Sequence, residues 1–204
     1  MKHHPDIGDN VSRETLDRLE AYVSLLLRWN RTINLISRRD EAVIWERHIA
    51  DSLALRPLLP SNFSHAIDLG AGGGLPGLVL AISTGKPFHL VESDQRKAAF
   101  LREAARTLAL SVTIHAARIE AVQISPAPVI TARALAPLNI LLTWSERLLA
   151  PNGICVFPKG RTIDDELTIA ASEWHMKVES VSSPTDPTAR FLRISEIHRV
   201  GRAT

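Results

Sequence analysis

The sequence predicts an α/β protein with a doubly wound, mostly parallel sheet and an N-terminal helical extension. From residue 66 onward, short apolar segments alternate with segments of helical periodicity, the pattern of βαβ units. A glycine-rich stretch, 70–77, separates the first expected strand from the first helix of this region. Because crossovers between parallel strands are right-handed, the ligand crevice is expected at the carboxyl ends of the strands.

The first part of the chain contains helical patterns only. A helix is expected from Ser12, a candidate N-cap, to Trp29, because apolar residues recur at helical spacing along it. A second helix is expected over 40–55, and the stretch 57–65, rich in proline, serine and asparagine, resembles a linker. We therefore divide the chain into a helical extension, 1–60, and an α/β core, 61–204, that act as one functional unit.

The remaining elements follow in chain order. Strands are expected over 66–69, 88–91, 112–115, 129–132 and 154–157, with two closing strands over 176–181 and 191–197. Helices are expected over 77–84, 95–108, 138–149 and 164–172.

Composition excludes several classes of protein. The chain has 204 residues and a net charge of +2, although nineteen of its basic residues are Arg and five are Lys. A single cysteine, Cys155, excludes a disulfide framework or a multi-cysteine metal site within one chain, and His3-His4 is too short for a metal tract. No apolar run approaches the ~20 residues needed to span a bilayer. We expect a cytoplasmic protein without a metal.

The main chemical signal is the loop Asp68-Leu69-Gly70-Ala71-Gly72-Gly73-Gly74-Leu75-Pro76-Gly77, between a strand and a helix. Glycines allow sharp turns and close approach of a ligand, and free amides at the helix start favour an acceptor-rich ligand. Glu92 ends the next strand, where an acid can accept both ribose hydroxyls of an adenosine. A glycine turn without a ligand is the simpler alternative.

The charge of Asp68 selects among adenosine cofactors. No Lys-Ser/Thr pair follows the glycines, and a carboxylate next to a pyrophosphate would be repelled. The ammonium and sulfonium groups of S-adenosylmethionine would instead attract it. The acidic strand end and the glycine loop resemble those of class I methyltransferases.

The absence of two motifs limits which atom could accept the methyl group. Methylation of pyrimidine carbon 5 requires a thiolate, but Cys155 lies within an apolar strand, where buried Cys is usually inert. The segment 131–137 also lacks the Asn/Asp-Pro-Pro-aromatic motif of many amino-group methyltransferases. A ring nitrogen such as guanine N7 offers a lone pair and needs no general base.

Several further motifs make a family resemblance specific. They are Trp29-Asn30-x-x-x-Asn34-Leu35-Ile36-Ser37, His48-Ile49-Ala50-Asp51-Ser52, the glycine loop, Val91-Glu92-Ser93, Thr131-Ala132-Arg133-Ala134 and Lys159-Gly160. Over nearly its whole length the chain resembles the glucose-inhibited division protein B family of bacterial ribosomal RNA small-subunit methyltransferases. The all-glycine Gly72-Gly73-Gly74 departs from relatives that often carry Ala, Pro or Ser, and the part after Lys159 matches least well.

The resemblance implies a reaction and a set of residues. The family transfers a methyl group from S-adenosylmethionine to N7 of a guanine, position 527 in the 530 loop of 16S ribosomal RNA. For the cofactor, the resemblance implies contacts from Gly70, Leu75, Ile119, Glu120 and Arg133. Together with the loop and strand-end residues, the expected cofactor set is Asp68, Gly70, Gly72, Leu75, Glu92, Ile119, Glu120 and Arg133.

Other residues are candidates for the reaction and for RNA. Arg133 follows the fourth strand and Lys159 the fifth, so both are candidate catalytic residues on the ligand side, with a structural salt bridge or a solvated lysine as alternatives. His48 has either a substrate-pocket role or a packing role. Arg31, Arg38 and Arg39 are candidate RNA contacts, although nine basic residues of the first 56 are balanced by nine acidic ones.

Two other functions stay open at this stage. The near-neutral charge is compatible with a methyltransferase for a small metabolite or a protein, and a non-catalytic nucleotide-binding module would bind cofactor without turnover. The favoured partner is 16S ribosomal RNA, within the small subunit or an assembly intermediate, and the chain is expected to act as a monomer without a membrane.

Overall fold

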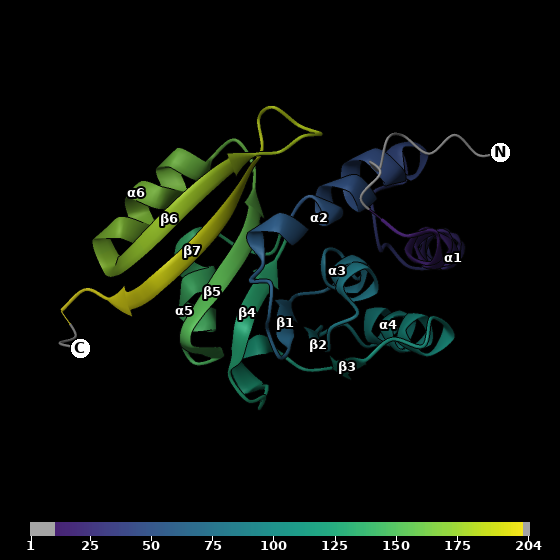
Figure 1. The fold of residues 1–204 in the computed structure, drawn as a ribbon, viewed down its shortest axis with the longest axis horizontal. Helices are drawn as coiled ribbons and strands as arrows, with labels where there is room; N and C mark the ends of the chain where they lie inside the picture. The colour runs from purple at the N-terminus through teal and green to yellow at the C-terminus, as the bar shows by residue number, and fades with distance from the viewer. Residues whose placement is uncertain (1–10, 202–204) are drawn as a thin grey trace.

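The computed structural model describes residues 11–201 and contains one seven-stranded sheet (Figure 1). The strand order is β3-β2-β1-β4-β5-β7-β6; neighbouring strands among the first five are parallel, and β7 runs antiparallel to both β5 and β6. The strands are β1 (Ala66–Leu69), β2 (Phe88–Val91), β3 (Val112–His115), β4 (Ala127–Ala132), β5 (Leu149–Lys159), β6 (Trp174–Ser182) and β7 (Arg190–Arg199). The predicted α/β class and mostly parallel sheet are confirmed.

Helices cover both faces of the sheet. One layer contains α1 (Arg13–Asn30), α3 (Gly77–Thr84) and α4 (Gln95–Thr107), and the other contains α5 (Leu138–Glu146) and α6 (Ile163–Glu173) (Figure 1). Between β3 and β4 the chain forms only the short 3₁₀ turn η4 (Ile119–Ala121). The predicted cap of α1 is confirmed, because the Ser12 hydroxyl accepts a hydrogen bond from the Thr15 amide.

The prediction of one continuous helix over 40–55 was wrong. This segment consists of the 3₁₀ turn η1 (Arg38–Val43), the π-helical turn η2 (Trp45–Ala50) and the short helix α2 (Asp51–Leu53), followed by the 3₁₀ turn η3 (Arg56–Leu58). Buried Ile44 and Ile49 are five residues apart, a spacing that a π-helix places on one face and an α-helix does not. The packing of these side chains therefore favours the wider turn.

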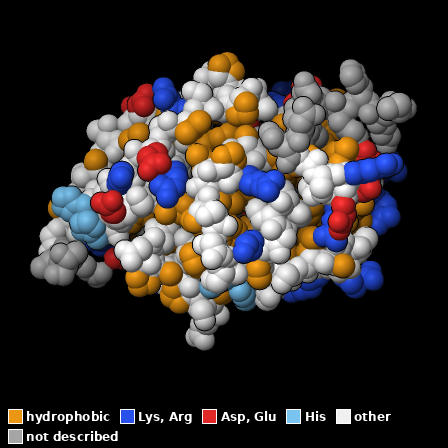
Figure 2. Space-filling model, in the orientation of Figure 1, with side chains coloured by type: hydrophobic (Ala, Val, Ile, Leu, Met, Phe, Trp, Pro, Cys, Tyr) orange, Lys and Arg blue, Asp and Glu red, His pale blue; other side chains and the backbone are white. Residues whose placement is uncertain are grey.

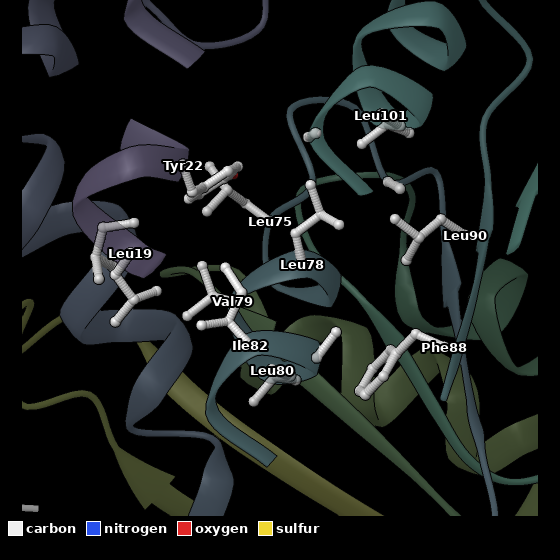
Figure 3. Close-up of a cluster of buried hydrophobic side chains, with 14 of the residues drawn as sticks. Leu19, Tyr22, Leu75, Leu78, Val79, Leu80, Ile82, Phe88, Leu90 and Leu101 are labelled. Atoms are coloured by element: carbon white, nitrogen blue, oxygen red, sulfur yellow. The ribbon is translucent and has the colours of Figure 1, made fainter. Parts of the chain in front are cut away.

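The extension and the sheet share one hydrophobic core. Leu19 and Tyr22 of α1 pack in the same buried cluster as Leu75, Leu78 and Val79 at and after the glycine loop (Figure 3). The Phe63 ring, just before β1, packs edge-on against Phe88 of β2. The helical extension and the sheet are therefore not separated by a gap between two hydrophobic cores. The boundary at residue 60 stays a prediction from the sequence.

Three other expectations concern composition. Cys155 is fully buried, and burial raises the pKa of its thiol to about 12, which fits the predicted inert role. The His3-His4 pair lies outside the described residues. Within 11–201, no helix has the length and apolar character to cross a bilayer, and no three side chains of the His, Cys, Asp or Glu type are arranged to hold a metal ion.

Candidate active site

The first of two adjoining cavities lies at the carboxyl ends of β1, β2 and β4 and has a volume of about 380 Å³. Seven residues of the expected cofactor set line it: Gly70, Gly72, Leu75, Glu92, Ile119, Glu120 and Arg133. Its volume lies within the range of small-molecule sites in proteins. Seven of the eight residues that the sequence predicted for the cofactor therefore line this cavity.

Glu92 links the ends of β1 and β2. Its carboxylate accepts hydrogen bonds from the Gly72 amide at 2.9 Å and from the Asp94 amide at 2.8 Å. Each carboxylate oxygen keeps a further lone pair, so Glu92 can also accept hydrogen bonds from the paired hydroxyls of a ribose. Its position at a strand end of the cavity agrees with the predicted role.

The glycine loop is held from both sides of the sheet. Gly70 has a φ of +63°, which strains any other residue, and a Cβ at this position would displace the Leu135 side chain, 2.5 Å away. On the other side, the fully buried Tyr22 hydroxyl donates a 2.5 Å hydrogen bond to the Gly73 carbonyl. The helical extension thus supports the loop directly, a role of Tyr22 that the sequence did not indicate.

Asp68 lies beneath the loop, outside the lining of the cavity. Its side chain is fully buried; one oxygen accepts the Thr131 hydroxyl at 2.6 Å and the other accepts the Gly77 amide at 3.2 Å. Burial raises the pKa of this carboxyl to about 7, although both hydrogen bonds and Arg133 lower it. These contacts make Asp68 a support for the loop, and its direct contact with the cofactor stays a prediction.

A short 3₁₀ turn forms one wall of the same cavity. Ile119 is buried and Glu120 is exposed in η4, and both line the cavity. The Arg147 guanidinium donates to the Ile119 carbonyl and, at 2.7 Å, to the Val122 carbonyl. Sequence analysis missed Arg147 because it comes from the end of α5, far from η4 in the chain.

The second cavity adjoins the first and has a volume of about 450 Å³. It shares Arg133 and Ala134 with the first cavity, and His48 and Lys159 also line it. Ala134 has a φ of +51°, an uncommon conformation for a residue with a side chain, and such strain is often found at functional sites. The structure therefore brings three predicted site residues together around one space: His48, Arg133 and Lys159.

Arg133 is held in place by a neutral histidine. Its Nη1 donates to His48 Nδ1 at 2.9 Å, and His48 Nε2 lies 3.4 Å from Asp40 Oδ2. Burial and the Arg133 charge lower the pKa of His48 to about 4, which keeps Nδ1 free to accept at neutral pH. His48 thus orients the guanidinium between the two cavities, and Asp40 lies next to the other ring nitrogen of His48.

Lys159 has carboxylate and carbonyl partners in this structure. Its ammonium lies 2.5 Å from Glu166 and 2.9 Å from the Ala136 carbonyl, and its side chain is 10% exposed. The same Glu166 accepts the Leu138 amide at the start of α5. Lys159 therefore joins the end of β5 to α5 and α6, and one of its three N–H groups remains for a ligand.

The candidate RNA arginines lie outside both cavities. Arg31, Arg38 and Arg39 are exposed and lie at the end of α1 and in η1. On the face drawn in Figure 2, blue side chains gather at the right-hand edge over α1 and α4, with acidic side chains among them. This face thus carries interspersed charges rather than one continuous basic patch.

The likeness to solved structures defines the class of protein. An N-methyltransferase NodS from Bradyrhizobium japonicum, solved with S-adenosylhomocysteine, has a TM-score of 0.58 at 14% identity over 89% of this chain and 99% of that one. An O-methyltransferase from Bacillus cereus gives a TM-score of 0.58 at 15% identity, over 86% of this chain and 91% of that one. The fold is that of class I S-adenosylmethionine-dependent methyltransferases.

The sequence comparisons identify the family. The family model GidB, described as rRNA small subunit methyltransferase G, matches residues 15–190. A ribosomal RNA small subunit methyltransferase G of Granulibacter bethesdensis is 61% identical over 95% of this chain and 91% of its own length. The protein of the same name from Gluconobacter oxydans is 53% identical, over 93% and 98%. The chain belongs to this family of S-adenosylmethionine-dependent ribosomal RNA methyltransferases.

Proposed function

We propose that this enzyme transfers a methyl group from S-adenosylmethionine to N7 of a guanine in the 530 loop of 16S ribosomal RNA. The observation that carries this proposal is the pair of adjoining cavities that share Arg133 and Ala134. A methyl transfer needs donor and acceptor in neighbouring sites with the reacting atoms in line.

We assign the cofactor to the first cavity. Glu92 fits the ribose hydroxyls, and the backbone of Gly70 and Gly72 allows close approach of the methionine part. Ile119 offers an apolar wall to the adenine, next to Glu120. When bound, the cofactor supplies a methyl group made electrophilic by the sulfonium charge. Asp68 and Tyr22 support this site from below and from α1.

We assign the guanine to the second cavity. Guanine N7 carries a lone pair that forms the new N–C bond, while the S–C bond breaks and its electron pair stays on sulfur. No proton has to move in this step, so the chain needs to position the base rather than supply a general base. Arg133 and the remaining N–H of Lys159 can donate to guanine O6 or to phosphate, which leaves the N7 lone pair free to attack.

We infer that the RNA binds as part of the small subunit or an assembly intermediate, and that the chain acts as a monomer. Arg31, Arg38 and Arg39 are free of the cavities and exposed, which suits contacts with phosphate. A few placed arginines are sufficient when one guanine of a structured particle is the target.

The direct test uses small subunits from cells that lack this gene. The purified enzyme and labelled S-adenosylmethionine are added, and the methylated nucleotide is mapped in the 16S RNA. We expect 7-methylguanine in the 530 loop and nowhere else. Label in a metabolite or a protein, or in another nucleotide, would contradict the proposal, and binding without turnover on subunits or metabolites would support a non-catalytic module.

A further inference from the structure

One wall of the second cavity comes from the turn between β6 and β7, more than 130 residues from the segment that it contacts. Thr185, Asp186 and Ala189 of this turn line the cavity together with Asp51 at the start of α2. In Figure 1 the turn lies at the top of the molecule and extends toward the helical extension. The acceptor site is therefore complete only when the two segments are held together.

Among the described residues, the hydrogen bonds between these two segments go to one carboxylate, that of Asp51. Asp51 Oδ1 accepts a hydrogen bond from the Ser183 hydroxyl at 2.7 Å and another from the Thr185 hydroxyl at 2.5 Å. Ser183 is 6% exposed, so its hydrogen bond to Asp51 is partly shielded from water, whereas the one from Thr185 is exposed. Hydrogen bonds to a charged acceptor are stronger than neutral ones, particularly where water is excluded.

The turn itself is organised around the same serine. Ser183 Oγ accepts the backbone amides of Thr185 and Asp186, each at 3.2 Å, and the Ser183 amide donates to the Ala189 carbonyl at 3.0 Å. The hydroxyl that binds Asp51 therefore also sets the conformation of the residues that face the cavity. A change at Asp51 would be transmitted to Thr185 and Asp186 directly.

We propose that Asp51 is a positioning residue that fastens the 183–189 turn onto the helical extension and so completes the guanine-binding wall. This proposal rests on the assignment of the second cavity to the guanine. The cofactor cavity has no lining residue from the 183–189 turn, and Asp51 does not line it. Asp51 should therefore govern how well the RNA is bound and aligned, with little effect on cofactor affinity.

The test compares four variants with the wild-type enzyme on small subunits that lack the modification. Asp51→Ala removes the acceptor, and we expect kcat/KM for the subunit to fall about 10- to 100-fold, since misplacement by about 1 Å can reduce a rate 10²-fold. Asp51→Asn keeps an oxygen acceptor and should recover most of this loss. The double variant Ser183→Ala, Thr185→Val removes the two donors and also the acceptor of the Thr185 and Asp186 amides, so its loss should be at least as large as that of Asp51→Ala. Adding Asp51→Ala to it should cost little more.

Three control measurements separate positioning from general damage. S-adenosylhomocysteine affinity, measured by calorimetry, should stay within about twofold of wild type in every variant. Amide exchange in Asp51→Ala should increase over 183–189 and stay unchanged over β1–β4. Asp165→Ala, at an exposed site of α6 without a described side-chain contact, should match wild type throughout.

Two results would overturn the proposal. One is a wild-type kcat/KM in Asp51→Ala; the other is an equal loss of cofactor affinity, which would indicate a general structural role. Failure of the wild-type enzyme itself to methylate guanine N7 would contradict the proposed function instead, so the two failures can be told apart. If Asp51→Ala does not fold, the Ser183→Ala, Thr185→Val variant carries the same test.

Discussion

The two cavities of this enzyme are built in different ways. The cofactor cavity is formed by strand ends and loops that follow each other within 70–135, with Leu35 and Trp144 added from outside that range. The acceptor cavity takes its walls from four segments, 47–51, 133–134, 158–166 and 185–189. A site built from consecutive βα units depends on local backbone conformation, whereas a site built from distant segments depends on the contacts that hold them together.

The largest expected effect comes from a pair of glycine variants, one beneath the cofactor cavity and one at the acceptor cavity. A Cβ at Gly77 would lie 2.6 Å from buried Asp68 Oδ2 and 2.6 Å from Leu90, whereas a Cβ at Gly160 meets nothing within 4 Å. We expect Gly77→Ala to lower the free energy of unfolding by about 3 kcal/mol and to weaken cofactor binding. Gly160→Ala, at the acceptor cavity, should leave both unchanged. Urea unfolding and calorimetry measure both effects; equal stability of the two variants would contradict the close packing beneath the glycine loop.

The residue shared by the cavities provides the second test. Arg133→Lys keeps a positive charge but loses the planar guanidinium that meets His48 at 2.9 Å. We expect kcat/KM for small subunits to fall about 100-fold, because a misaligned group at the boundary of both sites disturbs donor and acceptor. Steady-state kinetics measures this fall. A loss below threefold would show that charge alone is sufficient and that the Arg133–His48 hydrogen bond is not needed.

The protonation of Asp68 should make the stability of the protein depend on pH, with an effect of intermediate size. Its pKa is about 7 in the folded protein against an ordinary value of 3.8, so between these values the folded state keeps a proton that the unfolded state has lost. The stabilising contribution is therefore complete below pH 3.8 and is lost as the pH rises through 7. From pH 5 to 8, we expect wild-type stability to fall by about 2 kcal/mol more than that of Asp68→Asn. Urea titrations at each pH test this, and parallel profiles would contradict it.

The variant Asp68→Ala tests how far this buried carboxylate supports cofactor binding. The variant removes the hydrogen bonds to Thr131 and to the Gly77 amide, so the glycine loop loses a support. We expect weaker cofactor binding in calorimetry even though the side chain does not line the cavity. Wild-type affinity would contradict both the predicted contact and the supporting role.

The smallest effect is expected at the exposed arginines. Charge reversal by Arg38→Glu with Arg39→Glu should lower the methylation rate on small subunits about tenfold at low salt and less at high salt, because exposed phosphate contacts are screened. Cofactor affinity should not change. Kinetics at two ionic strengths measures the effect, and an unchanged rate would remove η1 from the RNA-binding surface.

The contrast between local and long-range contacts also explains which features could be predicted from the sequence. The glycine loop, Glu92 and the strand that carries Cys155 were predictable because each depends on residues adjacent in the chain. Asp68 was correctly linked to the loop, but its burial depends on Thr131 and Gly77, whose contacts come from tertiary packing. The periodicity of 40–55 also could not distinguish an α-helix from the 3₁₀ and π turns that the burial of Ile44 and Ile49 favours.

The acceptor cavity could be predicted only in part. His48, Arg133 and Lys159 were identified from their motifs and strand ends, yet the ion pair of Lys159 with Glu166 was not. Neither Thr185 nor Asp186 carries a sequence signal. The turn that contains them is held by hydrogen bonds to Asp51, which is 132 residues from Ser183 and 134 residues from Thr185 in the chain. Long-range contacts of this kind require the folded structure.

The assignment of the two cavities can be tested most directly by a crystal structure of the enzyme with S-adenosylhomocysteine. We predict that the ligand occupies the first cavity, with the ribose hydroxyls on Glu92 and the adenine next to Ile119, and that the second cavity contains no part of the nucleoside. A nucleoside bound among His48, Lys159 and Asp186 would contradict the division of donor and acceptor sites.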